Sequence, residues 1–291
     1  MRTPRLPFCD QTAIYVDLVG RVLKQFPRAT VLAHDGSGDW KDGYDDAGKN
    51  LTSNSRVTLA KGDALEQHFR RGWDISLPPP MSESLAMVRA SRELRVSTDR
   101  YDRIVGFKGA MNHRTRTRAA ELLHRPKQGL YVVPTSDKTI DYHQMIASSE
   151  FGLVIRGDVA FSYRFTETVC GGSVPVVIAD NWVMPFDDLV PFATYGLRVD
   201  EDQIERVYNL TAAVTADAAN RMRDTALRLC HAHLVTQYHQ FDAMLLLAAS
   251  FHVVWSSDAP ASASILTASW WPFEVAHRMA SQPDASMAAP C

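Results

Sequence analysis

The amino-acid sequence predicts an α/β protein built on parallel β-sheet. An apolar run at residues 151–155, a helical stretch at 161–170 and a second apolar run at 174–179 form a β-α-β unit. Short apolar runs of the same kind alternate with helical segments along most of the sequence, which is the pattern of a parallel sheet. With 291 residues, of which 46% are hydrophobic, the protein is long enough to bury one large core or two moderate ones.

The first hundred residues predict one helix and three strands. Apolar residues recur at helical spacing over 11–26. Short apolar runs predict strands at 29–33, 56–60 and 73–77. The first strand ends in a polar, glycine-containing loop that begins with His34 and Asp35. Because ligands bind at the carboxyl ends of parallel strands, this loop is in a functional position, and a surface turn is the alternative.

The remaining residues continue the alternation. In addition to the central pair, strands are predicted at 103–109, 130–133 and 195–199. Helices are predicted at 115–124, at 142–149 and from 203 onward. The most apolar stretch, 241–255, is shorter than the ~20 residues that a membrane span needs, and we expect a packed helix there. Residues 258–291 are rich in Ala, Ser and Pro and predict a weakly ordered tail.

The loop of the central β-α-β unit favours an anionic ligand. Arg156 and Arg164 flank the start of the helix, where Ser162 or Asp158 can cap the free N–H groups. A helix N-terminus attracts phosphate through its N–H groups and dipole, and the planar guanidinium of arginine matches phosphate oxygens. We therefore expect a phosphate-binding loop with Gly157 in its turn.

Three further residues of this unit suit a nucleotide diphosphate. Glu167 lies one turn inside the helix, and its carboxylate can accept hydrogen bonds from a ribose diol. Gly171 and Gly172 remove side chains where a backbone must pass close to a ring or a sugar, and we expect Gly171 to end the helix. The spacings of the common dinucleotide and P-loop motifs are absent. An ordinary β-α-β unit with a charged loop would explain the apolar runs but not these residues in this order.

The same residues resemble the signature of the exostosin family of glycosyltransferases, glycosyltransferase family 47. That signature is a strand, an Arg-Gly loop, Ser-x-Arg-Phe-x-Glu, and then Gly-x-x-Pro-Val-x-x-x-Asp-x-Trp-x-x-Pro-Phe. This protein matches it with Arg156-Gly157, residues 162–167, residues 172–176, residues 180–182 and Pro185-Phe186. The resemblance extends over roughly residues 11–235 and includes the loop that begins with His34 and Asp35.

The resemblance implies the fold called GT-B, in which two Rossmann-like halves face each other across a cleft. Residues 1–100 would form the N-terminal, acceptor-side half, and residues 101–257 the C-terminal half that binds the nucleotide sugar, followed by the tail at 258–291. The first half in this family normally opens with an extra strand and helix, and this sequence starts after them. We therefore expect an incomplete N-terminal half.

The resemblance also implies an activity. A sugar would pass from a nucleotide-diphosphate donor, expected to be a UDP-sugar, to a hydroxyl of a glycan or glycoprotein with inversion at the anomeric carbon. By this resemblance Asp35, with His34, is the general base, and Glu167 holds the ribose. Arg156 and Arg164 would neutralise the departing diphosphate without a metal ion or another cofactor. The donor site would be completed by Gly157, Ser162, Gly171 and Gly172.

Two alternatives from other classes stay open. One is a catalytically inactive exostosin-like subunit that binds glycan or stabilises a partner transferase. Related exostosins work in pairs, so a dimer with itself or with a related transferase is also expected. The other is a metal-dependent transferase that uses Asp200 and Asp202, although we interpret this acidic run as a cap for the helix expected from 203. His231 and His233 lie two residues apart, a spacing that points to different helix faces and does not suit a metal site.

The composition argues against binding to nucleic acid or to an anionic membrane, and it does not determine the cellular compartment. A net charge of −2 and a pI of about 6.5 give no bulk attraction to nucleic acid or to an anionic membrane. The dispersed cysteines show neither a zinc-site spacing nor a dense disulfide framework; they are Cys9, Cys170, Cys230 and Cys291. No signal peptide is visible in the sequence. The resemblance implies a protein of the Golgi lumen or membrane.

Overall fold

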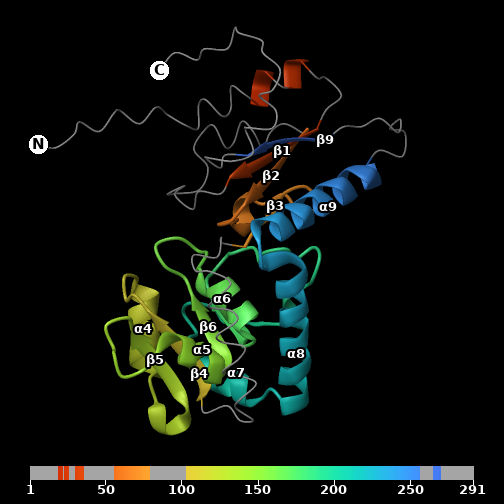
Figure 1. Ribbon diagram of the computed structural model, residues 1–291. Coiled ribbons are helices and arrows are strands. Elements are labelled where there is room, and N and C mark those ends of the chain that lie inside the picture. The colour runs from red at the N-terminus through yellow and green to blue at the C-terminus, as the bar shows by residue number, and fades with distance from the viewer. Residues whose placement is uncertain are drawn as a thin grey trace, which may run out of the picture.

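The computed structural model describes residues 19–21, 23–25, 30–35, 56–78, 103–255 and 265–269. These residues form two β-sheets in which all neighbouring strands run parallel (Figure 1). The strand order is β3-β2-β1-β9 in the first sheet and β5-β4-β6-β7-β8 in the second. The predicted α/β class, with two Rossmann-like halves, is therefore confirmed.

The first sheet begins close to where the sequence predicts it. Its strands are β1 (Thr30–Asp35), β2 (Val57–Lys61), β3 (Ile75–Ser76) and β9 (Ile265–Ser269). Main-chain pairing continues through His34 and Asp35, which lie opposite Ala60 and Lys61. The loop predicted to begin at His34 therefore begins later, because the ladder to β2 keeps both residues in the strand. Of the helix predicted at 11–26, residues 19–21 and 23–25 are helical, and the remainder lies outside the described residues.

Strand β9 corrects part of the expectation for the C-terminal segment. Its residues lie within 258–291, for which the composition predicts weak order. They pair in parallel with β1, from Thr30 opposite Ile265 to His34 opposite Ser269. A parallel neighbour supplies the backbone hydrogen bonds that an isolated segment of this composition lacks. The other residues of the segment lie outside the described part of the structure.

The second half follows the predicted alternation, with ends shifted by a few residues. Its strands are β4 (Arg103–Gly109), β5 (Leu130–Pro134), β6 (Ser149–Ile155), β7 (Val174–Ile178) and β8 (Leu197–Arg198). The α-helices that follow β4 in the described residues are α4 (Arg114–Leu123), α5 (Tyr142–Ser148), α6 (Arg164–Gly171), α7 (Arg206–Ala212), α8 (Ala216–Leu229) and α9 (Gln237–Trp255). Shorter helical turns are η1 (Glu66–His68), η2 (Pro126–Gln128), η3 (Phe192–Thr194) and the π-helical η4 (Cys230–Leu234). All five residues of β7 are buried, as expected of a parallel strand covered on both faces.

Helix α6 of the central unit begins three residues later than predicted, at Arg164. Tyr163 occupies the N-cap position and makes no side-chain capping hydrogen bond. Of the two predicted caps, Ser162 contributes only a long contact, in which its Oγ accepts from the N–H of Arg164 at 3.4 Å. Asp158 instead accepts a hydrogen bond from the side chain of Asn112 at 3.3 Å. The start of this helix is therefore held by loop packing more than by a cap.

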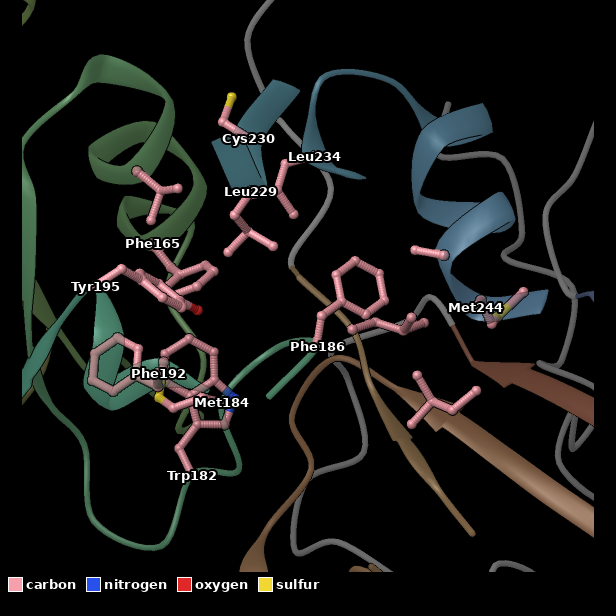
Figure 2. Packing of buried hydrophobic residues seen from close by; sticks show 14 of the residues in the cluster. Phe165, Trp182, Met184, Phe186, Phe192, Tyr195, Leu229, Cys230, Leu234 and Met244 are labelled. Atoms are coloured by element: carbon pink, nitrogen blue, oxygen red, sulfur yellow. The ribbon is translucent and has the colours of Figure 1, made fainter. Parts of the chain in front are cut away.

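One hydrophobic cluster includes residues of both halves (Figure 2). It joins Leu32 and Ile75 of the first sheet to Phe165 of α6 and to Met244 and Leu247 of α9. Helix α9, expected to be a packed helix, thus lies against the first sheet although it follows the second half in sequence (Figure 1). None of the helices in the described residues has the length and apolar character needed to cross a membrane.

The two halves also meet along a polar seam. The buried indole of Trp182 donates from Nε1 to the carbonyl of Gly62 at 3.2 Å. The N–H of Val183 donates to the carbonyl of Ala64 at 2.8 Å, and the hydroxyl of Ser76 donates to the carbonyl of Val183 at 2.7 Å. Gly62 and Ala64 follow β2, Ser76 is the last residue of β3, and Trp182 and Val183 follow β7. The carboxyl ends of the strands in the two sheets therefore face each other, as the GT-B fold requires.

A buried disulfide crosses the second half. It joins Cys170, in the last turn of α6, to Cys230, the first residue of η4, with a Cα–Cα distance of 5.3 Å. The sequence does not predict this pair, because a separation of 60 residues says nothing about proximity in space. The bond ties the helix that carries Arg164 and Glu167 to the turn between α8 and α9.

Candidate functional site

The candidate site lies at the carboxyl ends of β4 and β6. Arg156 and Gly157 follow β6, Arg164 and Glu167 come from the first turn of α6, and Arg116 comes from the first turn of α4. These elements meet at the edge where open α/β sheets bind ligands. The predicted residues Arg156, Gly157, Arg164 and Glu167 thus gather at one edge of the sheet, together with an arginine from another helix.

Arg164 and Glu167 form an ion pair that also includes a tyrosine. Nη1 of Arg164 contacts Oε2 of Glu167 and donates to the hydroxyl of Tyr142 at 2.6 Å. The same hydroxyl donates to Oε2 of Glu167. Nε of Arg164 donates to the carbonyl of Lys108 at 3.1 Å, and its Cζ lies 4.3 Å from the centre of the Tyr142 ring. These contacts orient both charged groups before any ligand arrives.

Arg156 is held by an acid from beyond β8. Its Nη1 lies 3.1 Å from Oε1 of Glu201, and its Nε is buried without a hydrogen-bond partner among the described residues. Glu201 also accepts from the hydroxyl of Thr115 at 2.7 Å and from the N–H of Asp180 at 3.0 Å. Burial pushes the pKa of Glu201 upward, but these hydrogen bonds and Arg156 together hold it below its usual value. Arg156 is thus partly neutralised within the protein.

Glu201 also corrects the interpretation of the acidic run. We interpret Asp200, Glu201 and Asp202 from the sequence as a helix cap, but α7 begins at Arg206 and its N-cap is Glu205. The run serves tertiary contacts instead, because Glu201 reaches Arg156. In the described part of the structure, no group of three or more His, Cys, Asp or Glu side chains is placed to hold a metal ion.

Arg116 is a site residue that the sequence did not single out from its neighbours on the same helix. Its Nε donates to the carbonyl of Arg156 at 3.0 Å, and its Nη2 to the carbonyl of Ile155 at 3.2 Å. A Cβ added at Gly157 would lie 3.1 Å from Nη2, so glycine leaves room for the guanidinium. Burial, and then the positive charge of Arg164, lower the pKa of Arg116. The two arginines repel each other, and an anion beside them would relieve that repulsion.

His113 adds a neutral hydrogen-bond donor near Arg156. It is the N-cap of α4, and its Nδ1 accepts from the N–H of Thr115 at 3.2 Å, which assigns the ring proton to Nε2. Burial, and then the charge of Arg156, lower the pKa of His113, so the ring is neutral at physiological pH. The set combines two repelling arginines, a neutral donor and a carboxylate, which suits an anion that also carries hydroxyl groups.

Gly171 and Gly172 lie at the other end of α6 and serve the fold. A Cβ at Gly171 would meet Cγ2 of Ile146 at 2.3 Å, so this glycine allows α5 and α6 to pack closely. Gly172, and not Gly171, adopts the left-handed conformation that ends the helix, with φ of 77°. The amino edge of the sheet lies at this end of the helix, and the structure does not bring either glycine to the arginines.

In the first half, Asp35 lies at the carboxyl end of β1 opposite Lys61 of β2, while the side chains of His34 and Asp35 lie outside the described part of the structure. The turn after β2 contains a second carboxylate that the sequence did not single out. Nζ of Lys61 lies 2.9 Å from Oδ1 of Asp63, and both side chains are buried. Burial raises the pKa of Asp63 above its usual value, although Lys61 opposes the rise.

The fold and the site define the class of the protein. Two parallel α/β halves whose strand ends face each other, with a cationic site on the second half, are the arrangement of GT-B glycosyltransferases. The model of the Exostosin GT47 domain matches residues 32–214, which is more than half of the chain. The chain therefore belongs to the exostosin family of glycosyltransferases, as the signature residues predict.

Curated relatives agree with this family. An exostosin-1 homologue of Caenorhabditis elegans is 25% identical over 218 residues, which cover 66% of this chain and 56% of the relative. Exostosin-1c of Danio rerio is 24% identical over 229 residues, which cover 68% of this chain and 30% of the relative. A probable glucuronosyltransferase of Oryza sativa is 34% identical over 76 residues, or 26% of this chain and 18% of that protein. The protein thus spans about half, or less, of the length of these relatives.

Solved structures show a general similarity. The structure of HepE from Anabaena in complex with UDP aligns over 84% of this chain and 77% of that one, with a TM-score of 0.43 and 10% identity. WaaG, a glycosyltransferase of lipopolysaccharide biosynthesis, aligns over 84% of this chain and 85% of that one, with a TM-score of 0.39 and 10% identity. Similarities of this size transfer neither a ligand nor the role of a residue.

Proposed function

We propose that the protein transfers a sugar from a nucleotide-diphosphate donor, a UDP-sugar, to a hydroxyl of a glycan or glycoprotein. Membership of the exostosin family supports the reaction class. One observation carries the donor site: the guanidinium groups of Arg116 and Arg164 both lie at the carboxyl ends of β4 and β6, next to the hydrogen-bonded carboxylate of Glu167. A diphosphate would neutralise the arginines, and the ribose hydroxyls would reach the carboxylate.

The chemistry is a single displacement. The acceptor oxygen attacks the anomeric carbon and loses its proton to a base, while the bond from that carbon to the diphosphate oxygen breaks and its electron pair leaves with the diphosphate. Attack from the face opposite the leaving group inverts the anomeric centre. Asp35, with His34, is the proposed base, because the carboxyl end of β1 faces the second half. Arg116, Arg156 and Arg164 stabilise the departing charge in place of a metal ion.

The proposed compartment is the Golgi, in its lumen or at its membrane. The buried disulfide between Cys170 and Cys230 supports this choice, because such bonds form and persist in oxidising compartments and are rare in the cytosol. An acceptor glycan or glycoprotein in the same compartment, and pairing with a second transferase chain, complete the proposal.

The test begins with binding. Calorimetry with UDP and GDP should show a preference for UDP. Glu167→Gln should weaken UDP at least about tenfold, since hydrogen bonds to charged groups are worth about 1.5–3 kcal/mol. Arg114→Gln is the matched control, because Arg114 is an exposed arginine on α4 and its loss should leave affinity unchanged.

Turnover decides between the candidate functions. Release of UDP from UDP-sugars, measured with and without a chelator and with oligosaccharide acceptors, should proceed in chelator. Loss of turnover in chelator would favour the metal-dependent alternative. A protein that binds glycan or a partner transferase but gives no transfer would be the inactive subunit. A folded protein that binds no nucleoside diphosphate would contradict the proposal.

A further inference from the structure

The phenol of Tyr142 stands between the two charged groups of the donor site. It donates to Oε2 of Glu167 and accepts from Nη1 of Arg164 at 2.6 Å. We propose that Tyr142 is a positioning residue that makes the site selective for nucleotides with intact ribose hydroxyls, by holding Glu167 in place to receive them. This inference rests on the proposed function and deepens it.

The direction of each hydrogen bond follows from the chemistry of the three groups. A guanidinium only donates and an ionised carboxylate only accepts. The phenol has one proton, and it goes to Glu167, so the phenol oxygen is left to accept from Arg164. Tyr142 thus connects a cation and an anion through one donated and one accepted hydrogen bond, which restricts rotation of the Glu167 side chain.

As a result, the two carboxylate oxygens of Glu167 have different roles. Oε2 of Glu167 receives both Tyr142 and Arg164. Among the described residues no hydrogen bond to Oε1 is found, although the side chain is only 8% exposed. Oε1 therefore keeps its capacity for hydroxyl donors of the ligand, and the ribose contact falls on this one oxygen instead of being shared by both.

The position of Tyr142 is itself fixed by the fold. It is the first residue of α5, whose N-cap Asp141 accepts from the N–H of Gln144 at 2.9 Å. Its ring lies 4.3 Å from Cζ of Arg164, a cation–π contact that holds the guanidinium. The ring face contacts Arg164, whereas the hydroxyl contacts both Glu167 and Arg164. Removing the hydroxyl alone therefore keeps the ring contact to the arginine and takes away the only one of these contacts that reaches Glu167.

The experiment compares UDP with 2′,3′-dideoxy-UDP by calorimetry in the parent, Tyr142→Phe and Glu167→Gln. The parent should bind UDP more tightly than the dideoxy analogue. Tyr142→Phe keeps the ring contact to Arg164, so it should weaken UDP roughly threefold to tenfold, the size of one hydrogen bond, and weaken the analogue by less. Discrimination between the two ligands should fall toward the value in Glu167→Gln. The variant with both substitutions, Tyr142→Phe and Glu167→Gln, should discriminate between UDP and the analogue to the same extent as Glu167→Gln alone, because Tyr142 acts through Glu167.

The controls separate this inference from the proposed function. Tyr208→Phe removes the hydroxyl of an exposed tyrosine on α7 and should leave both affinities unchanged. Equal losses of UDP and the analogue in Tyr142→Phe would show a merely structural residue and overturn the inference. Unchanged discrimination in Tyr142→Phe would overturn it as well, with the proposed function intact. A folded parent that binds neither ligand would overturn both.

Discussion

Arg116 and Arg164 are two like charges that act on each other across the loop after β6. Arg164 is the charge that, after burial, lowers the pKa of Arg116, and Arg116 is anchored to the carbonyl of Arg156 at 3.0 Å. Arg164 is ion-paired with Glu167, whereas the hydrogen bonds of Arg116 go to carbonyl and amide oxygens, so an anionic ligand can balance the charge of Arg116. This relationship links the fold of the second half to its proposed donor.

The first prediction concerns Arg116. Arg116→Gln should reduce UDP affinity roughly tenfold, because one charge-assisted contact to the diphosphate is lost. It should also make UDP binding less sensitive to salt, because salt weakens charge–charge attraction and the variant has one attracting charge fewer. Calorimetry at two salt concentrations measures both effects, with Arg114→Gln as the control on the same helix. Equal affinity and salt dependence in the parent and Arg116→Gln would make Arg116 purely a support for β6.

The second prediction concerns the proposed base. Asp35→Asn should lower transfer by ~10²–10⁴-fold and leave UDP affinity unchanged, because the base serves the acceptor and not the donor. Steady-state transfer assays and calorimetry give the two values. Asp63→Asn is the comparison, since Asp63 is a carboxylate at the same edge of the sheet. Normal transfer in Asp35→Asn combined with its loss in Asp63→Asn would move the role of base to Asp63.

The third prediction concerns the disulfide. A bond that closes 60 residues should stabilise the fold by roughly 4 kcal/mol in the chain-entropy description. Urea unfolding of Cys170→Ala/Cys230→Ala should show a loss of this order, and reductant should no longer shift its midpoint. Cys9→Ala/Cys291→Ala should keep the sensitivity to reductant. A double variant of Cys170 and Cys230 as stable as the oxidised parent would contradict the prediction.

The fourth prediction concerns pH. The folded protein holds the pKa of Glu201 below its ordinary value of 4.5, so the ionised form stabilises the fold. This contribution is fully present above pH 4.5 and is lost as the pH falls through the lower folded-state value. Urea midpoints of the parent and Glu201→Gln should therefore differ near neutral pH and converge in acid. A difference that stays constant down to pH 3 would assign the effect to packing instead of charge.

Local sequence pattern was sufficient to predict the elements of the second half and to bring together several residues of its candidate site. Strands such as β7 are continuous apolar runs, and the order of Arg156, Arg164 and Glu167 around one helix start already indicates an anion and a hydroxyl-bearing ligand. These features depend on residues close together in sequence. Short-range periodicity and spacing therefore contain them.

Pairings between distant segments depend on long-range packing. Arg116 looks like its neighbours Arg114 and Arg118 in the sequence, and only the approach of α4 to β6 selects it. The bond between Cys170 and Cys230, the return of α9 and β9 to the first sheet, and the contact of Tyr142 with Glu167 arise in the same way. The order of residues is enough to say which segments become strands and helices and where the charges sit along them. Which charges meet is settled only in the folded molecule, because a contact across many residues leaves no periodic trace in the sequence.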